Sequence, residues 1–447
     1  MLPIVTPAEM AAIDAAAAEP VEVLIGRAGS AVARAALDVL RGSYGRRVVV
    51  LAGKGNNGAD GRDAASRLRR IGVRVEVVDA ALAPARLPPA DLVVDAAYGT
   101  GFHGEYRAPV IGGTPVLAVD IPSGVNGLTA EPAERVLAAT RTVTFAALKP
   151  GLVLEPGATL AGDVTVAHIG LDVSGAKAHL VGDADVAGWL PERPAVAHKW
   201  QAAVWVVAGS PGMTGSATLV ARAAQRAGAG YVRLSTPGGD PGEGAPTEAV
   251  GTALPDDEWD LRVLAGLERF QALVVGPGLG RQPAAEVRHV VAEAGVPVVV
   301  DGDGLSALGT DVARYARPTT VLTPHDGEYR RLTGRPPQAA RLAAARDLAA
   351  HAGCTVLLKG PATVVADPDG AVMVTTAGDA RLATAGTGDV LAGVLGALLA
   401  LGMPTVEAAA AAAHVHGRAG NLGWARGLVA GDLVEHLPAV LTELAGH

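Results

Sequence analysis

Short runs of apolar residues recur along the chain and alternate with Ala-rich segments that have the composition of helices. The runs occupy residues 47–53, 73–79, 91–97 and 115–124 in the first half, and 203–210, 272–280, 296–304, 319–328 and 354–360 in the second. Strands that are apolar at every position are buried on both faces, which is typical of parallel sheets covered by helices. The pattern therefore predicts an α/β protein with a parallel sheet in each half.

Gly, Asp, Ser, Asn and His collect where the predicted strands end. Ligands of parallel α/β sheets bind beyond the carboxyl ends of the strands, so we expect a binding site in each half. Between the halves, residues 171–199 are less periodic and contain Pro191 and Pro194. We place a domain boundary near residues 175–195 on this basis. The alanine run at 408–413 is expected to be helical.

The composition argues against several classes of protein. The 447-residue chain has a net charge of −8, so no basic field is expected to attract nucleic acid or an anionic membrane. The single cysteine, Cys354, excludes an intrachain disulfide and suits a reducing cytosol. The first residues do not resemble a signal peptide, and the longest apolar stretch, 390–403, is shorter than the roughly 18 residues of a membrane span. We therefore expect a cytoplasmic protein.

Residues 51–61, with the sequence LAGKGNNGADG, follow directly on a predicted buried strand. The glycines permit positive φ angles and let backbone N–H groups approach a ligand, while the asparagines offer carbonyl oxygens to a cation or a hydroxyl group. A tight strand-to-helix turn with capping asparagines would have the same composition. Taken alone, the segment supports either interpretation.

Three further strand ends carry polar motifs, which are VDAAYGTGFHGE at 94–105, VDIPSGVN at 119–126 and TFAALKPG at 144–151. Each could be an ordinary turn. Together with the opening TPAEMAAID at 6–14, however, they resemble the NAD(P)H-hydrate epimerase family over about residues 1–170. The resemblance implies an N-terminal domain, residues 1–180, with a Rossmann-like three-layer α/β/α fold.

By this resemblance Asn57, Asp95 and Ser123 hold a potassium ion (K+), and oxygen ligands of these kinds do suit a hard cation. Asp120 is implied to do the acid/base work, with Lys149 as its assistant. The alternative is that Asp120 caps the turn at Pro122 and Lys149 forms a surface ion pair. The loop 99–105 would hold the dinucleotide phosphates through backbone N–H groups. The residues implied in substrate binding are Asn56, Asn57, Gly58, Ala59, Asp60, Gly99, Thr100, Gly101, Phe102, His103, Gly104, Glu105 and Asp120.

In the second half, residues 384–396, TAGTGDVLAGVLG, place a Gly-Thr-Gly turn before an apolar helix. The start of such a helix offers free N–H groups and a positive dipole end to a phosphate. Asp389, in the first turn, could accept a hydroxyl proton as a phosphoryl group is transferred. It could also be only a favourable charge at a helix N-terminus.

Neighbouring motifs are HKW at 198–200, AGSPGMTGSATL at 208–219, GPGLG at 276–280, VVDGDGL at 299–305, LTPHDGE at 322–328 and LLKGPATVVADPDG at 357–370. The set resembles the ribokinase-like NAD(P)H-hydrate dehydratase family over about residues 183–445. This implies a C-terminal domain, residues 183–447, with a ribokinase-like α/β/α fold and with Asp389 as catalytic base. Ala217, Gly278 and His325 would contact the hydrated nicotinamide nucleotide, although His325 could instead be structural. The implied contacts to the adenine nucleotide are Lys359, Gly360, Pro361, Ala362, Thr363 and Gly388.

The chain departs from the family patterns at a few positions. Ala59 stands where the epimerase family has a second glycine, and Gly26 stands where it has a glutamate. In the second half Trp200 replaces a usual glycine, while Gly302 and Gly304 replace alanines. None of these changes removes an implied ligand or catalytic group.

The two resemblances together imply metabolite repair. The first domain would interconvert the R and S forms of hydrated NADH and NADPH (NADHX and NADPHX). The second would restore the coenzyme from the S form with ADP, or with ATP, while magnesium (Mg2+) bridges the nucleotide phosphates. We further expect a homo-oligomer without nucleic-acid or membrane partners. Two alternatives are a vitamin-type kinase with a dinucleotide-sensing first domain, and a first domain that is only a scaffold. The polar cluster at the strand ends of the first half argues against a scaffold.

Overall fold

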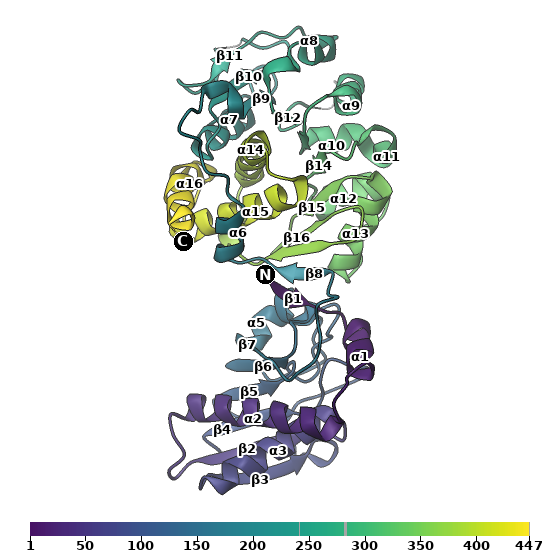
Figure 1. Cartoon of the computed structure of the whole chain (residues 1–447), viewed down its shortest axis with the longest axis vertical. Coiled ribbons are helices and arrows are strands. Elements are labelled where there is room, and N and C mark those ends of the chain that lie inside the picture. The colour runs from purple at the N-terminus through teal and green to yellow at the C-terminus, as the bar shows by residue number, and fades with distance from the viewer. Residues whose placement is uncertain (241, 281–283, 447) are drawn as a thin grey trace. The chain divides into compact units, whose positions relative to one another are not determined.

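The computed structural model describes residues 1–240, 242–280 and 284–446, and they form two compact units (Figure 1). The N-terminal unit comprises Leu2–Ala178, and the C-terminal unit comprises His179–His447. Within the described residues, no helix combines the length and the apolar character needed to cross a membrane.

The N-terminal unit is built on a six-stranded, wholly parallel sheet with the order β3-β2-β4-β5-β6-β7. Its central strands β4 and β5 are buried along their whole length, and every residue in them except Asp95 is apolar. The strands of this unit are β1 (Leu2–Ile4), β2 (Arg47–Ala52), β3 (Arg74–Asp79), β4 (Leu92–Ala96), β5 (Val116–Val119), β6 (Arg141–Phe145) and β7 (Asp163–Ala167).

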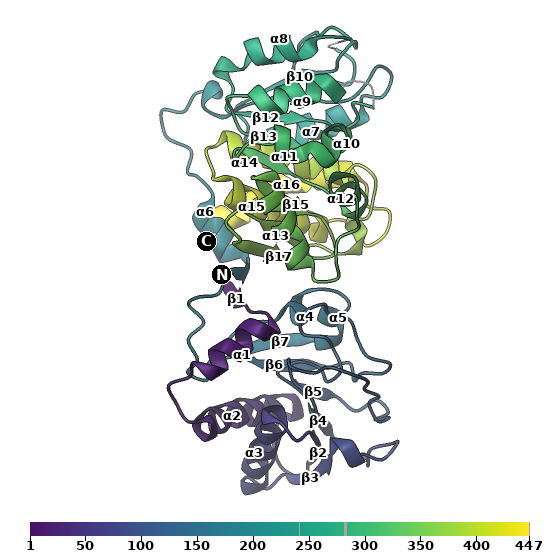
Figure 2. The same ribbon diagram turned by 90° about the vertical axis from the view of Figure 1, so that its right-hand side faces the viewer.

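One face of this sheet is covered by α2 and α3, which lie side by side in both views (Figures 1 and 2). The opposite face is covered largely by connecting segments, whose Leu87, Ala108 and Leu137 pack against Val93 and Val116. The helices of the unit are α1 (Pro7–Ala15), α2 (Val21–Leu40), α3 (Asn56–Arg70), α4 (Pro150–Val153) and α5 (Gly157–Ala161), with a 3-10 turn at Ala80–Leu82.

The C-terminal unit has a larger sheet, in which the strands from β8 onward follow the order β8-β17-β16-β15-β14-β13-β12-β9-β10-β11. Strands β9 to β15 pair in parallel, whereas β16 runs antiparallel to both β15 and β17. The strands are β8 (Ala178–Leu180), β9 (Ala203–Val207), β10 (Tyr231–Ser235), β11 (Val250–Gly251), β12 (Ala272–Val275), β13 (Val298–Val300), β14 (Thr320–Leu322), β15 (Thr355–Leu358), β16 (Thr363–Ala366) and β17 (Val372–Thr375).

Helices lie on both faces of this second sheet. Helices α7, α14, α15 and α16 pack together in one large apolar cluster against one face, and α9 to α13 lie over the other (Figure 2). The helices are α6 (Asp183–Trp189), α7 (Gly215–Arg226), α8 (Trp259–Ala265), α9 (Ala284–Glu293), α10 (Asp303–Leu308), α11 (Val312–Tyr315), α12 (Asp326–Thr333), α13 (Arg341–Ala352), α14 (Thr387–Ala400), α15 (Thr405–Leu422) and α16 (Ala430–Ala445). Short 3-10 turns span Lys199–Ala202, Leu267–Arg269, Gly309–Asp311 and Ala380–Leu382.

The sequence pattern predicts most of these elements. Each apolar run forms a strand, the alanine run 408–413 lies buried in α15, and the apolar segment after the Gly-Thr-Gly turn is the buried helix α14. The two-domain parallel α/β fold is thus confirmed. The antiparallel strands β16 and β17 were not predicted, because the pattern indicated parallel sheets alone. They are joined by a turn in which Gly370 adopts a φ of +92°.

Both sheets contain a point at which the direction of strand addition reverses. The chain passes from β2 to its neighbour β3 and then returns to the other side of β2 with β4. In the C-terminal unit it passes from β9 to β10 and later places β12 on the other side of β9. The connections leaving such a pair of strands diverge, which opens a crevice beyond their carboxyl ends. The folds therefore favour one site in each unit.

Candidate active sites

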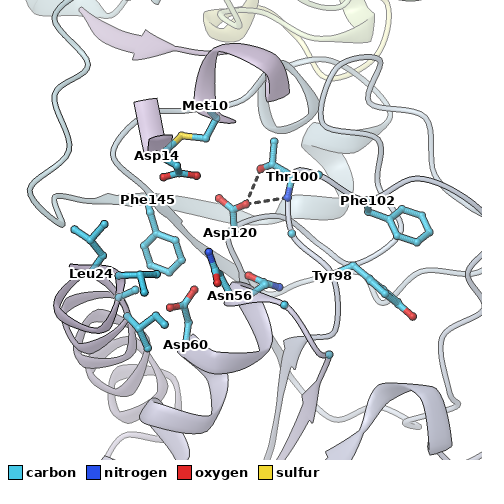
Figure 3. A pocket seen from close by; sticks show the side chains of 18 of the residues that line it. Met10, Asp14, Leu24, Asn56, Asp60, Tyr98, Thr100, Phe102, Asp120 and Phe145 are labelled. Atoms are coloured by element: carbon cyan, nitrogen blue, oxygen red, sulfur yellow. Dashed lines mark hydrogen bonds between the residues drawn. The ribbon is translucent and has the colours of Figure 1, made fainter. Parts of the chain in front are cut away.

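A cavity of about 860 Å³ lies at this point of the N-terminal unit (Figure 3). Its wall is formed by the segments that follow β2, β4 and β5, together with residues of α1, α2 and α3. Leu24 and Phe145 supply an apolar side, while Asp14, Asp60 and Asp120 face the cavity from three different segments. A cavity of this size with a few convergent polar groups has the character of a small-molecule site.

Asp120 is held by four hydrogen bonds at the end of β5. Its Oδ2 accepts from the backbone N–H of Thr100 (2.9 Å) and from the Thr100 hydroxyl (2.6 Å). Its Oδ1 accepts from Lys149 Nζ (2.6 Å) and from the Thr144 hydroxyl (3.2 Å). Lys149 Nζ also donates to the Thr144 hydroxyl and to the Phe145 carbonyl, and its side chain is 1% exposed. Asp120 therefore does not cap the turn at Pro122, and Lys149 does not form a surface ion pair.

The backbone and the charge at Asp120 are both unusual. Asp120 has a φ of +67°, a left-handed conformation that costs a non-glycine residue free energy and that is often found at functional sites. Burial raises the pKa of the Asp120 carboxyl, but the charge of Lys149 and the hydrogen bonds from Lys149 and Thr100 outweigh it and hold the pKa below its usual range. Asp120 is therefore ionised at neutral pH and oriented by fixed donors.

Asp95 and Ser123, two of the implied potassium ligands, contact each other in the interior. The backbone N–H of Ser123 donates to Asp95 Oδ2 (2.9 Å), and both residues are fully buried. The Ser123 hydroxyl accepts from the backbone N–H of Tyr98 (2.9 Å). The third, Asn57, lines the cavity, and in the described part of the chain both polar atoms of its side chain are buried without a hydrogen-bond partner. Buried amides are ordinarily satisfied, so the Asn57 side chain has the properties of a ligand rather than of a cap.

The glycines around Asn57 are explained by close backbone contacts. A Cβ atom on Gly53 would lie 1.9 Å from the Ala97 carbonyl oxygen, and one on Gly58 would lie 1.9 Å from the Gly53 carbonyl oxygen. The loops after β2 and β4 therefore cross in van der Waals contact. The N-cap of α3 is Gly55, without a side-chain cap. A turn capped by asparagine, the second interpretation of this segment, is not what the structure shows.

The C-terminal unit carries its site at the start of α14. Gly386, with a φ of +89°, is the N-cap, and the Thr387 hydroxyl donates to the carbonyls of Leu382 and Thr384, which fixes the turn. The first N–H groups of a helix have no intrahelical acceptor, so this turn presents free donors. Asp389 lies in the first turn, where burial raises its pKa to about 6. A carboxyl with that pKa is mostly ionised at neutral pH and still basic enough to take a proton.

A lysine and two acidic residues lie next to this turn. Lys359 Nζ donates to Asp301 Oδ1 (2.8 Å) and lies 3.5 Å from Glu328 Oε2. Burial alone would lower the pKa of Lys359, but the two carboxylates outweigh it and raise the pKa above its usual value. The position that a Cβ atom on Gly388 would occupy lies 3.6 Å from Lys359 Nζ and 3.9 Å from Asp301 Oδ2, so both charged groups lie beside the helix start. The turn and the charged cluster thus form one polar site.

The implied substrate contacts of this unit lie around the same helix start. A cavity of about 520 Å³ is lined by Gly278, Glu328 and Asp389 among others. Ala217 does not line this cavity; it is buried on α7, with its Cβ near Gly209. His325 is the N-cap of α12: its Nδ1 accepts from the backbone N–H groups of Gly327 and Glu328, and its side chain is 55% exposed. The ring therefore has a structural role, and its Nε2 lies 3.5 Å from Glu328 Oε1.

The comparisons with known proteins bear on both units. The NAD(P)H-hydrate dehydratase family matches residues 204–442, and the N-terminal segment of YjeF-related proteins matches residues 21–87 and 78–151. A bifunctional NAD(P)H-hydrate repair enzyme of Moorella thermoacetica is 38% identical over 99% of this chain and 97% of its own length. One from Mycobacterium leprae is 38% identical over 85% of this chain and 84% of its own length. The chain belongs to the family of bifunctional NAD(P)H-hydrate repair enzymes.

Solved structures agree with this membership for the C-terminal unit. The ADP/ATP-dependent NAD(P)H-hydrate dehydratase of Bacillus subtilis, co-crystallised with ATP and Mg2+, is 31% identical and has a TM-score of 0.51, covering 59% of this chain and 97% of that one. A ribokinase-like superfamily protein of Enterococcus faecalis has a TM-score of 0.54 at 22% identity, covering 61% of this chain and 98% of that one, which shows the fold alone. The ribokinase-like fold of this family member is thus confirmed, and the chain is an enzyme of the repair family.

The structure of this family member brings some of the predicted site residues together and leaves others apart. In the N-terminal unit Asn56, Asn57, Asp60, Gly99, Thr100, Gly101, Phe102, Asp120 and Lys149 line the cavity. Gly58, Ala59, His103, Gly104, Glu105, Asp95 and Ser123 do not. In the C-terminal unit Gly278 and Asp389 share a cavity, Lys359 and Gly388 approach each other, and His325 neighbours Glu328.

Sequence reasoning missed several residues of these sites, although most of them stood in motifs that it singled out. Asp14 and Glu328 end the motifs at 6–14 and 322–328, and Asp301 lies inside the motif at 299–305. Their signal was an acidic residue within such a motif. His416 had no comparable signal: its Nε2 donates to the Thr387 carbonyl from the buried face of α15 (2.9 Å), and burial lowers its pKa to about 4, so the ring stays neutral.

Proposed function

We propose that the N-terminal unit of this repair enzyme interconverts the R and S epimers of NADHX and NADPHX, and that the C-terminal unit dehydrates the S epimer back to NADH or NADPH. The observation that carries the proposal is the presence of two separate sites, each with a buried carboxylate at the strand-end crevice of its own unit: Asp120 in one and Asp389 in the other. The domain bounds proposed from the sequence, 1–180 and 183–447, assign one activity to each unit.

In the epimerase site Asp120 is the acid/base residue and Lys149 its assistant. Lys149 keeps Asp120 ionised, so the carboxylate is ready to accept a proton from the hydroxyl group of the hydrate. Thr100 and Thr144 fix the direction of the carboxylate lone pairs. The segment Gly99–Phe102 borders the same cavity, which supports its assignment to the dinucleotide.

The proposed potassium ligands Asn57, Asp95 and Ser123 have the donor set that a hard cation prefers, namely an amide, a carboxylate and a hydroxyl oxygen. The side chain of Asn57 is buried without a partner in the described residues, and burial raises the pKa of Asp95. Both properties are expected of residues that bind a cation. A cation bound there would supply positive charge beside the cavity. Asn57, Asp95 and Ser123 would hold it, and Asp120 would remain free for proton transfer.

In the dehydratase site Asp389 takes the proton of the C6 hydroxyl, whose oxygen then attacks the terminal phosphoryl group of the nucleotide. The N–H of Thr387 donates to the Thr384 carbonyl, so the N–H groups of Gly386 and Gly388 are the ones that stabilise the negative charge that develops on the phosphoryl oxygens. Departure of the phosphate restores the ring double bond. Lys359 and the segment that follows it, as far as Thr363, would contact the adenine nucleotide, with His325 and Gly278 on the hydrate.

Mg2+ fits the same site, because the Asp301 carboxylate lies next to the proposed phosphate position and this ion is held in nucleotide sites by one or two carboxylates plus phosphates. The bound ion would neutralise phosphate charge during transfer. We also propose that the protein is cytoplasmic and homo-oligomeric; its one cysteine, Cys354, is free and buried, as suits a reducing compartment.

We propose that ADP is preferred over ATP as the phosphoryl donor. The dehydratase of Bacillus subtilis is described as ADP/ATP-dependent, so both nucleotides are plausible donors for this family. Steady-state dehydration rates with each nucleotide at saturation measure the preference. A rate with ATP about tenfold or more above that with ADP, a difference of about 1.4 kcal/mol in barrier, would overturn it.

The function is tested by incubating the full-length protein with mixed R and S hydrates, with and without ADP. Without nucleotide the two epimers should equilibrate and no NADH should form. With ADP both epimers should disappear while NADH absorbance and phosphate appear in equal amounts. Accumulation of a stable phosphorylated hydrate would instead indicate the kinase alternative, and failure of the epimers to equilibrate would contradict the first activity.

A further inference from the structure

The cavity of the N-terminal unit contains more acidic groups than the proposed function uses. Asp14 on α1, Asp60 on α3 and Asp120 after β5 point into the same space (Figure 3). Of these, Asp120 alone is paired with a cation in the part of the chain that the structure describes. Lys149 is committed to that pair, because its ammonium group also donates to Thr144 and Phe145. One ammonium group therefore balances only one of the three acids.

Asp60 is more buried than Asp14, the other acid of the three that is not paired with a cation. It is 6% exposed, and its pKa is shifted by burial and by other acids alone, with no hydrogen bond or cation from a described residue to lower it. Its neighbours Leu24 and Phe145 are apolar (Figure 3). An ionised carboxylate in such surroundings would lose its hydration without compensation, whereas a protonated carboxyl group would lose much less. The geometry thus favours a neutral Asp60 that carries a proton into the cavity.

The charges around Asp60 also favour its protonated form. Burial raises the pKa of Asp60 to about 8, and the charges of Asp120, Asp63 and Asp14 add to the effect. The titratable groups that face the cavity from the surrounding elements are Asp14, Glu19, Lys54, Asp60, Asp79, Tyr98, Asp120 and Lys149. Asp120 and Asp60 therefore differ in protonation near neutral pH, and two groups whose environments separate their pKa values in this way are suited to act as base and acid.

We propose that Asp60 is the general acid of the epimerase site and that it works against Asp120 as the base. The inference rests on the proposed epimerase function and adds a second catalytic residue to it. Epimerisation needs both groups, because the hydroxyl-bearing carbon C6 of the hydrate is a hemiaminal carbon bonded to the ring nitrogen N1. Breaking the C6–N1 bond without supplying a proton would leave a negative charge on N1.

The step balances in atoms and electrons. Asp120 removes the proton of the C6 hydroxyl, the O–H electron pair becomes the second bond of a C6 carbonyl, and the electron pair of the C6–N1 bond passes to N1, which takes the proton from Asp60. Rotation about the C5–C6 bond presents the other face of the carbonyl to N1. Closure then reverses each transfer, so that Asp60 regains its proton from N1 and Asp120 returns its proton to the oxygen. No oxidant or further reactant is consumed.

The test compares full-length wild type with Asp60→Asn and with a matched control, Asp38→Asn. Asp38 on α2 is an exposed acid that pairs with Arg141, is absent from the cavity wall and is not among the charges that raise the pKa of Asp60. We expect Asp60→Asn to lower kcat for R-to-S conversion at least about 100-fold at neutral pH while KM changes little, since loss of a general acid has effects of this size. Wild type and the control should lose activity as the pH rises through about 8, and this alkaline limb should vanish in Asp60→Asn.

Thermal unfolding separates a catalytic role from a structural one. Asn has the shape of Asp without the charge that burial penalises, so Asp60→Asn should unfold at a higher temperature than wild type at alkaline pH. An Asp60→Asn variant with wild-type kcat and an unchanged alkaline limb overturns the inference, as does one that loses activity together with thermal stability. A wild-type protein that interconverts no epimers overturns both this inference and the proposed epimerase function.

Discussion

Asp120 and Asp389, the two carboxylates central to the proposed chemistry, differ because their neighbours differ. Asp120 is paired with a buried ammonium group, which lowers its pKa, while Asp389 is shielded from water without a comparable pair, which raises its pKa to about 6. Both carboxylates are therefore mostly ionised at neutral pH, as a base must be, and the pKa of Asp389 lies near the working pH. The pKa of each carboxylate, and with it the proposed role, therefore depends on the charged groups that lie beside it.

Asp389→Asn should abolish dehydration and leave epimerisation unchanged, because the amide keeps the shape of the side chain but cannot accept the proton. The loss should be about 10²- to 10⁴-fold in kcat. In wild type the dehydration rate should rise with pH through about 6, as Asp389 ionises. NADH formation from pure S hydrate measures both effects. Asp369→Asn, an exposed acid in the β16–β17 turn, is the control. Loss of both activities in Asp389→Asn would contradict the separate sites.

Lys149→Met should slow epimerisation and destabilise the N-terminal unit. Removing the ammonium group leaves the Asp120 carboxylate buried without its positive partner, a change that typically lowers the free energy of unfolding by about 3–5 kcal/mol. Lys149 holds the pKa of Asp120 in the folded protein below its value in the unfolded chain. The ion pair therefore stabilises the fold at pH values above the unfolded pKa, and this stabilisation is lost as the pH falls through the folded pKa. The free energy of unfolding, measured with denaturant at several pH values, reports this loss. The exposed Lys177→Met is the control, and equal stability of the two variants would show that the pair contributes nothing.

At the scale of elements, the sequence predicts the strands and the site residues that follow them, because the carboxyl ends of parallel strands meet at one edge. In the structure Asp95 lies near the end of β4, Asp120 follows β5 directly, and Asn57 lies in the first turn of α3 after β2. This logic cannot identify contributions from elsewhere, such as Asp14 on α1 or His416 on α15, because these depend on how helices pack over the sheet edge. Nor can it show that Lys149 lies within 2.6 Å of Asp120, since the two residues lie on connections that only the tertiary fold brings together.

Asn57→Ala should make epimerisation dependent on higher potassium concentrations. The variant loses one proposed ligand, so the cation binds more weakly and the carboxylate of Asp120 loses a nearby positive charge, which raises its pKa and slows the reaction near neutral pH. The epimerase rate as a function of potassium concentration measures the effect, and dehydration of pure S hydrate should stay unchanged.

Asn126→Ala provides the matched control for Asn57→Ala. The side-chain oxygen of Asn126 accepts from the backbone N–H groups of Leu128 and Thr129, so it is an asparagine that stabilises a turn. Its loss should lower stability by about 1 kcal/mol without altering the response to potassium. A wild-type epimerase rate that is independent of potassium would contradict the proposed cation site.

At the scale of the whole molecule, the account assigns consecutive reactions to two compact units of one chain. Each unit has its own sheet, its own apolar core and its own site beyond the carboxyl ends of its strands. Neither proposed catalytic carboxylate belongs to the unit of the other. A substitution that inactivates one site should therefore leave the other site active. Two variants inactivated at different sites should together carry out both reactions, because the hydrate can diffuse from one chain to the other.

The most direct test of this central claim is conversion of pure R hydrate to NADH, with ADP, by a mixture of two full-length variants. Asp120→Asn alone should dehydrate S hydrate but leave R hydrate, and Asp389→Asn alone should epimerise R hydrate without forming NADH. The account predicts that the mixture forms NADH from R hydrate at a rate approaching that of wild type. A mixture that forms no more NADH from R hydrate than Asp120→Asn alone would contradict it.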